Sequence, residues 1–268
     1  DPLHPLWKAE DQTAFHSWAN DNEDVPDDVP PRSLIPAGQP LVVSRVQAAE
    51  FVRQAKARIL ELTSAWEPGS LGRCLEWDEP FYARHGFGKL CRHFDILSYA
   101  DLAAGRLEAR EVYPMGTRIL TVDVLNLPRW VPRDYGIVVC FFVLEHVTDP
   151  HAAMRGVVRM MLPGGFLLLG APFVDGVHAC PNDFFRYTPS GLRRLALDAG
   201  LDVLWAMSPG GPAVAAGDLL GLKSSYWAAE ALLEESSDQP ANVFLLAAKP
   251  GWHPRGPTRA NVTGAAAR

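Results

Sequence analysis

Between about residue 43 and residue 248, segments with the apolar spacing of strands alternate with segments that have the apolar spacing of helices. Short apolar runs, which are typical of strands, occupy 73–77, 93–99, 117–122, 135–142, 166–170, 201–207 and 243–248. The nearly continuous run at 135–142 is typical of a central parallel strand that is covered on both faces. Segments with helical spacing lie between several of these runs. The alternation predicts an α/β fold, a doubly wound and mostly parallel sheet with helices on both faces.

Capping and turn residues give the boundaries of the expected helices. Ser44 opens a helix that extends to about residue 62. Asp149 caps the next expected helix, which the Pro-Gly-Gly turn at 163–165 ends. Thr188, followed by proline, starts a further helix in the same way. An Ala/Leu-rich segment predicts a last helix over 216–235.

Three segments follow from these patterns. Residues 1–42 are acidic and rich in proline, which predicts an extended arm. Its Trp7 and Trp18 would dock onto the main domain or onto a protein partner. Residues 43–250 form the predicted α/β domain, and residues 251–268 are expected to be a flexible tail.

Composition narrows the classes of partner. Hydrophobic residues make up 48% of the chain, enough for a full core, and the net charge is −6. No dense Lys/Arg stripe occurs, so we expect no nucleic-acid partner. No apolar run has the length of a membrane span. The chain begins at Asp1, so we expect that a leader, with any targeting signal, was removed or omitted.

The four cysteines are scattered and form no CxxC pair, so no metal site is expected. Cys74 and Cys140 lie in apolar strand patterns, where we interpret them as reduced core cysteines. Reduced cysteines are typical of a cytoplasmic protein.

Three polar segments come directly after predicted strands, which is where open α/β sheets bind ligands. They read DVLNLP at 123–128, FFVLEHVTDP at 141–150 and HACPNDFFRYT at 178–188. Together they resemble motifs of the class I S-adenosylmethionine-dependent methyltransferases, in particular those of methyltransferase type 11. The resemblance implies a Rossmann-like methyltransferase sheet and S-adenosyl-L-methionine as cofactor. It also implies a small polar or sugar-like acceptor molecule.

The resemblance assigns roles to residues of the first two segments. Asp123 and Val124 would contact the adenine of the cofactor, and the alternative for Asp123 is a turn cap. Phe141 would also lie beside the cofactor. His146 is a candidate general base, because a histidine can titrate near neutral pH. The favoured alternative is a histidine bonded to backbone at the helix entry, since methyl transfer to a competent nucleophile needs only proximity.

The third segment resembles a loop that closes over the acceptor. His178 is the second candidate catalytic residue. Asp183, Arg186 and Tyr187 are the candidate acceptor-binding residues. An Asp183–Arg186 pair would serve equally well as a clamp that holds the loop, and both interpretations stay open.

The turn after the first strand departs from the family pattern. That pattern is an acidic residue followed by three glycines, which let the backbone approach the cofactor closely. Here the segment 76–82 reads EWDEPFY, in which Glu76 matches the acidic position. The glycine positions are occupied by Asp78, Pro80 and Tyr82. The usual cradle for the methionine end of the cofactor cannot form here in its usual shape.

Acidic and aromatic residues near this turn remain candidate cofactor contacts. These are Glu76, Trp77, Asp78 and, after the second strand, Asp101.

Two functions are compatible with these features. The first is a methyltransferase acting on a small polar or sugar-like acceptor. The second is a catalytically inactive binding or partner module of methyltransferase fold, which the loss of three turn glycines favours. A Rossmann dehydrogenase ranks last, because it needs a glycine-rich first turn as well.

Overall fold

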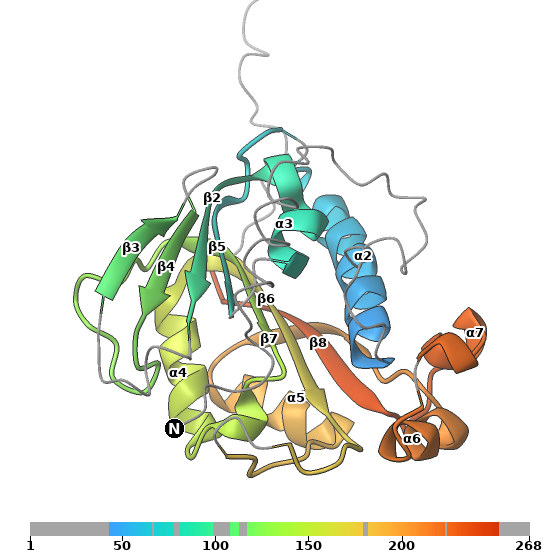
Figure 1. The fold of residues 1–268 in the computed structure, drawn as a ribbon. Coiled ribbons are helices and arrows are strands. Elements are labelled where there is room, and N and C mark those ends of the chain that lie inside the picture. Colours follow the sequence, from blue (N-terminus) through green and yellow to red (C-terminus); the bar gives the residue numbers. More distant parts are fainter. Residues whose placement is uncertain are drawn as a thin grey trace, which may run out of the picture.

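An eight-stranded sheet organises the chain in the computed structural model, in the order β3-β4-β2-β1-β5-β6-β8-β7 (Figure 1). The structure describes residues 43–65, 67–77, 81–98, 108–112, 117–178, 182–222 and 224–251. The strands are β1 Gly72–Trp77, β2 Cys91–Leu97, β3 Glu108–Val112, β4 Thr117–Thr121, β5 Tyr135–Phe141, β6 Met161–Pro172, β7 Asp202–Met207 and β8 Asn242–Ala248. The five neighbouring strands β4, β2, β1, β5 and β6 run parallel. At the two edges, β3 pairs antiparallel with β4, and β8 pairs antiparallel with both β6 and β7. The predicted doubly wound, mostly parallel sheet is confirmed.

Helices cover both faces of this sheet (Figure 1). They are α2 Val43–Thr63, α3 Phe81–Phe87, α4 Pro150–Met160, α5 Pro189–Asp198, α6 Pro212–Leu219 and α7 Ala229–Leu233. The helices α2 and α3 pack on one face, where Phe51 meets Ile137 and Phe244 in one apolar core. The helices α4 and α5 pack on the other face around Met154 and Leu192. Buried apolar surface on both faces stabilises the sheet from both sides.

Two of the predicted helix starts are confirmed in detail. The Asp149 side chain accepts a hydrogen bond from the backbone nitrogen of Ala152, and Thr188 accepts one from Gly191. Each helix has a proline in its first turn, where the missing N–H costs nothing. These caps satisfy backbone donors that would otherwise be unpaired at the helix ends.

The predicted helix over 216–235 is wrong, because the structure divides this segment into α6 and α7. Gly221 follows α6 with φ of +74°, a left-handed conformation that ends a helix. A Cβ atom on Gly217 would lie 2.4 Å from the Trp227 ring, so the two halves fold back on each other. The turn at 163–165 was also misplaced, since α4 already ends at Met160 and these residues belong to β6.

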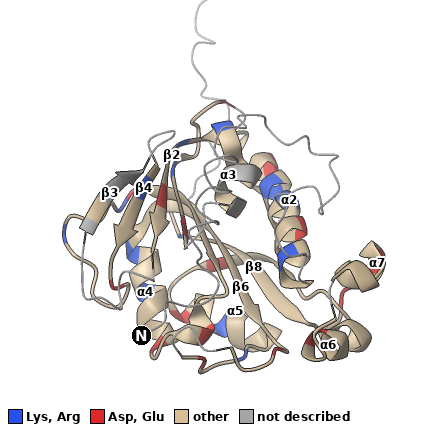
Figure 2. Ribbon diagram, in the orientation of Figure 1, with Lys and Arg blue, Asp and Glu red and all other residues tan. Residues whose placement is uncertain are grey.

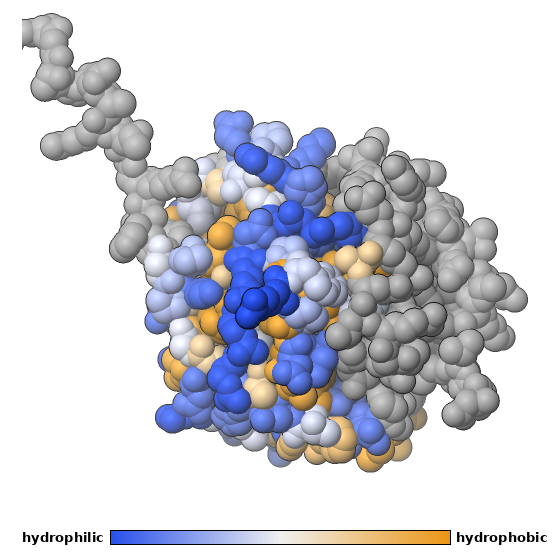
Figure 3. Space-filling model, turned by 90° about the vertical axis from the view of Figure 1, so that its left-hand side faces the viewer, coloured by the Kyte–Doolittle hydropathy of each residue, from blue (hydrophilic) through white to orange (hydrophobic). Residues whose placement is uncertain are grey.

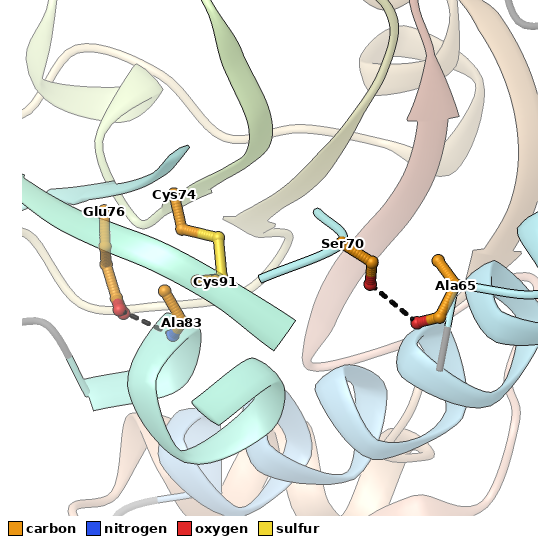
Figure 4. Close-up of a disulfide and its surroundings, with 6 residues drawn as sticks. All are labelled: Ala65, Ser70, Cys74, Glu76, Ala83 and Cys91. Atoms are coloured by element: carbon orange, nitrogen blue, oxygen red, sulfur yellow. Dashed lines mark hydrogen bonds between the residues drawn. A yellow bond between two sulfur atoms is a disulfide. The ribbon is translucent and has the colours of Figure 1, made fainter. Parts of the chain in front are cut away.

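Cys74 is not a reduced core cysteine as expected, because its sulfur is bonded to that of Cys91 (Figure 4). The bond joins β1 to the start of β2. Cys140 is free and buried, as expected. The disulfide removes the cysteine argument for a cytoplasmic location. The predicted arm at 1–42 and most of the tail lie outside the described residues.

Charged residues of both signs are interspersed over the described part of the fold (Figure 2). On the face shown in Figure 3, a broad band of hydrophilic side chains separates smaller hydrophobic areas. Among the residues described, no helix is both long and apolar enough to cross a bilayer.

A buried carboxylate links four adjacent strands of the sheet. Asp95 of β2 is 1% exposed and accepts two hydrogen bonds from Arg118 of β4, at 2.9 and 2.7 Å. It also accepts from Arg73 of β1 at 3.3 Å and from the Tyr135 hydroxyl of β5. Burial, reinforced by Asp95, raises the pKa of Tyr135 well above its ordinary value. The hydrogen bonds of this network therefore offset the free-energy cost of burying the charge of Asp95.

We expect Asp95→Asn to remove this charge and weaken every bond in the network. The free energy of unfolding should fall by roughly 2–4 kcal/mol, less than for a fully buried pair because both arginines are partly exposed. Chemical denaturation measures the change. Asp134→Asn is the matched control, because Asp134 pairs with the same Arg73 but its side chain is 56% exposed. Equal destabilisation by the two variants would contradict this account of Asp95.

Candidate functional site

A cleft opens where the carboxyl ends of β1, β2, β4 and β5 meet. It is lined by Trp77, Leu97, Ser98, Val122, Asp123, Val124, Leu125, Val143, His146, Val147, Thr148, Asn182 and Phe184. From β1 the strands continue through β2 and β4 on one side and through β5 and β6 on the other. The cleft thus lies at the topological switch point, where open α/β sheets bind ligands.

The loop after β4 forms one wall of this cleft. Asp123 Oδ1 accepts a hydrogen bond of 2.9 Å from the Leu125 nitrogen, so this carboxylate does cap its own turn. Asp123 and Val124 both line the cleft as well. A Cβ atom on Gly156 would lie 2.0 Å from the Val124 carbonyl oxygen, so α4 packs directly against the loop. The close packing holds the loop in place.

Glu76 supports the start of α3 instead of facing the cleft. It lies at the end of β1 and is 4% exposed. Its carboxylate accepts a hydrogen bond of 3.0 Å from the backbone nitrogen of Tyr82. It accepts a second, of 2.7 Å, from the backbone nitrogen of Ala83 (Figure 4). The acidic residue therefore stabilises the N-terminus of α3. Trp77, next in sequence, lines the cleft.

The other candidate cofactor contacts lie elsewhere. The Phe141 ring packs in the core, 5.1 Å from the Tyr82 ring and 5.6 Å from the Phe244 ring between centroids. Phe141 is not among the residues that line the cleft. Asp78 and Asp101 lie outside the described residues, so both stay predictions.

The two candidate catalytic histidines meet at the other side of the cleft. Their ring centroids are 5.0 Å apart with the planes nearly perpendicular. His146 Nδ1 lies 2.6 Å from the carbonyl oxygen of Asn182, and His178 Nδ1 lies 3.0 Å from that of Gly176. A carbonyl oxygen can only accept, so each Nδ1 carries a proton and donates. The backbone bond expected for His146 is present.

Glu145 stands between these histidines, and its side chain is fully buried. Its Oε1 lies 3.8 Å from His146 Nε2 and 3.9 Å from His178 Nε2. Neither carboxylate oxygen has a hydrogen-bond partner among the described residues. Burial raises the pKa of Glu145 to about 8, and burial also lowers the pKa of His146.

Arg186 holds the loop between β6 and α5. Its guanidinium donates to both oxygens of Asp183, at 2.5 and 2.7 Å, and to the carbonyl of Gly176 at 2.8 Å. The Arg186 guanidinium holds the pKa of Asp183 well below its ordinary value. The hydroxyl of Tyr187 donates to the Leu144 carbonyl at 3.0 Å. The contacts seen for these three residues are those of a loop clamp.

Sequence reasoning missed several residues of this site. Glu145 lies in the segment 141–150 but was not predicted to have a role, although a glutamate beside an apolar strand signals a special environment. Asn182 and Phe184 reach the cleft because the loop folds back, held by the Asp183–Arg186 pair and by the bonds of Asn182 to His146 and of Phe184 to the Glu145 carbonyl. Ser98 directly follows β2, lines the cleft and carried no signal in the sequence.

Comparisons with known proteins point to one family. A family model described as a methyltransferase domain matches residues 81–169. The ubiquinone biosynthesis O-methyltransferase of Nitrosospira multiformis is 33% identical over 93 residues, which are 27% of this chain and 37% of that protein. A polyketide synthase-nonribosomal peptide synthetase of Aspergillus flavipes is 30% identical over 90 residues, 31% of this chain and 2% of that protein. The chain therefore spans well under half the length of these curated relatives.

Solved methyltransferase structures are similar over most of the chain, and one example has both ligands bound. It is the 1,6-didemethyltoxoflavin-N1-methyltransferase of Burkholderia thailandensis with bound 1,6-didemethyltoxoflavin and S-adenosylhomocysteine. Sequence identity is 13%, the TM-score is 0.47, and the alignment covers 93% of each chain. The match to the family model begins at residue 81, after most of the turn that lacks glycine.

We expect Arg186→Lys to loosen the loop, because lysine keeps the charge but cannot form the two-pronged contact with Asp183. Amide hydrogen exchange in residues 174–178 and 182–188 should accelerate by roughly tenfold to a hundredfold, the range for loss of a charged hydrogen bond. Arg193→Lys on the exposed face of α5 is the control and should leave exchange unchanged. Unaltered exchange in Arg186→Lys would show that Arg186 does not hold the loop.

Proposed function

As this chain belongs to the class I S-adenosylmethionine-dependent methyltransferase family, we propose that it transfers a methyl group from S-adenosylmethionine to a small polar or sugar-like acceptor. The observation that carries the proposal is the position of the Asp123 loop. It forms the wall of a cleft at the switch point of the sheet, between the carboxyl ends of β4 and β5.

The residues present fit the adenosine half of the cofactor. Asp123 offers a carboxylate that can accept from the exocyclic amine of adenine, while Val124, Leu125 and Val147 provide apolar surface for the ring. Ser98 at the end of β2 supplies a hydroxyl on the side where ribose would lie. This combination of apolar walls with a few polar groups is typical of cofactor clefts.

The methionine half would be held differently from the usual family pattern. Glu76 is engaged by the backbone nitrogens of Tyr82 and Ala83, so α3 starts where other members have a glycine-rich turn. Trp77 lines the cleft next to this point and offers an aromatic face to a sulfonium cation. We propose Asp78, which follows it, as the partner of the positive charges of the cofactor.

Once bound, S-adenosylmethionine would supply an electrophilic methyl group, which an acceptor lone pair takes as the carbon–sulfur bond breaks. The chain's contribution is to position the acceptor in a cleft with largely apolar walls. His146 and Phe184 line the cleft on the side away from β4, and we assign the acceptor to this side. The Nitrosospira relative is named an O-methyltransferase, which supports an acceptor hydroxyl as nucleophile, whose proton would pass to solvent water as the oxygen–carbon bond forms.

The alternative is a binding module that has lost methyl transfer. The capped start of α3, in place of a glycine-rich turn, favours it. A methyltransferase would bind the cofactor and pass its methyl group to an acceptor, whereas a binding module would not transfer it. Binding without transfer to any hydroxylated acceptor would favour the module.

We expect Asp123→Asn to weaken S-adenosylhomocysteine binding by roughly tenfold to a hundredfold, the range for losing a charge-assisted hydrogen bond. Asparagine can still accept from the Leu125 nitrogen and preserve the turn, but its remaining amide group donates and cannot accept from adenine. Isothermal titration calorimetry measures the affinity, and the free energy of unfolding should stay within about 0.5 kcal/mol of the original.

Asp149→Asn provides a matched control. Asp149 is exposed, caps α4 through the Ala152 nitrogen and does not line the cleft. Asparagine caps helices as well as aspartate does, so affinity should not change. If Asp123→Asn binds S-adenosylhomocysteine as tightly as the original chain, the carboxylate serves the turn alone and the placement of adenine is wrong.

A further inference from the structure

Three potential metal ligands converge at the edge of the cleft. The ligand atoms of Glu145, His146 and His178 all lie within 4.8 Å of one another. Glu145 and His146 come from the short helical turn Leu144–His146 after β5, and His178 comes from the loop after β6. Residues far apart in sequence therefore direct one carboxylate and two imidazoles to one point.

The orientation of both imidazoles is fixed by their outer nitrogens. Each Nδ1 donates to a backbone carbonyl, from Asn182 for His146 and from Gly176 for His178. Each Nε2 is left with a lone pair, and both Nε2 atoms lie near Glu145 Oε1. Histidines that bind metals show this same arrangement, with the non-ligating N–H held by a carbonyl or carboxylate.

Glu145 is the second, independent sign of a missing partner. Its carboxylate is fully buried, and both oxygens lack a hydrogen-bond partner among the described residues. Buried polar groups are nearly always hydrogen-bonded, since an unpaired one loses its hydration and gains no hydrogen bond in exchange. The two Nε2 atoms do not satisfy this carboxyl group, because at 3.8 and 3.9 Å both lie beyond hydrogen-bond distance of Oε1. A cation placed between the three groups would satisfy all of them.

We propose that Glu145, His146 and His178 bind one divalent transition-metal ion through Glu145 Oε1 and the two Nε2 atoms. Ligand atoms about 2.1 Å from a tetrahedral ion stand about 3.4 Å apart, so the two glutamate–histidine pairs need to close by roughly 0.5 Å and the histidine–histidine pair by at most about 1.4 Å. Two imidazoles with one carboxylate suit zinc, iron or cobalt better than magnesium or calcium.

The surrounding charges are compatible with an added cation. Arg186 is the nearby positive group, and Asp183 neutralises it through both carboxylate oxygens. Asp175 lies 3.2 Å from His178 Nδ1 and adds negative charge on the outer side of the imidazole. Three protein ligands leave a coordination position for water or substrate. His146 also lines the cleft, so the ion would lie at the proposed acceptor side.

Cobalt(II) is the probe that tests the proposal, because its visible absorption reports ligand type and coordination. The full chain, stripped with a chelator and free of any histidine tag, is titrated with Co²⁺ and followed by absorption and calorimetry. We expect one ion per chain, with ligand-field bands of nitrogen and oxygen ligands and no thiolate charge-transfer band. The titration contains no S-adenosyl compound, so its failure is distinct from failure of the proposed function.

Variants separate this site from other histidines. Glu145→Gln and His178→Ala should each weaken binding at least about a hundredfold, beyond the usual cost of losing an outer contact. His151→Ala removes an exposed histidine of α4 and should bind like the original chain. Thermal unfolding without metal shows whether each variant is folded. If Glu145→Gln, at a buried position, does not fold, then His178→Ala tests the site alone, since the His178 side chain is 41% exposed.

Three results would overturn the proposal. The first is no stoichiometric uptake of Co²⁺ at millimolar concentration. The second is unchanged binding in His178→Ala. The third is an equal loss in His151→Ala, which would indicate non-specific binding to surface histidines.

Discussion

A single buried carboxylate holds the strands whose ends form the cleft. Asp95 of β2 bonds to side chains from β4, β1 and β5, which are the strands that carry the cleft walls. A buried charge of this kind is tolerated only where its partners stand at the correct positions, so it favours one alignment of the four strands over others. That alignment brings the Asp123 loop, Trp77 and the turn after β5 to one edge of the sheet. The cleft thus depends on contacts within the strands as well as on the loops that line it.

The start of α3 shows how the fold persists without a glycine-rich turn. In the family pattern the backbone approaches the cofactor because small residues permit it. Here Glu76 accepts from the first backbone nitrogens of α3, and the bulky Tyr82 packs its ring against Phe141. The helix therefore begins with side chains filling the space in which glycines leave room. Under the proposed function, cofactor binding at this end would depend on side chains such as Trp77, which lines the cleft.

The central sheet could be predicted from the sequence because its strands are continuous apolar runs bounded by caps and turns. The buried strand at 135–141 and the helix capped by Asp149 are examples in which local signals and tertiary packing agree. The edge strand β3 and the helix α3 carry no such signal. The break between α6 and α7 depends on Gly217 meeting Trp227, a contact between residues ten positions apart that propensity does not show.

The site divides in the same way. The ends of the predicted strands indicated the Asp123 loop and His146 as site candidates, and the structure places both at the cleft. The role of Glu76 and the grouping of Glu145 with His178 depend on how loops fold back in three dimensions. The pairing of Cys74 with Cys91 likewise required the strands to be placed, since cysteine spacing alone does not determine connectivity.

The most direct measurement of the central claim is a crystal structure of the chain with S-adenosylhomocysteine. We expect adenine between Val124 and Val147 with its amine near the Asp123 carboxylate, the ribose near Ser98, and Glu76 still bonded to the start of α3. Electron density for the ligand away from this cleft would contradict the account. A crystal structure obtained at a saturating concentration of S-adenosylhomocysteine, with no ligand density in this cleft, would contradict it as well.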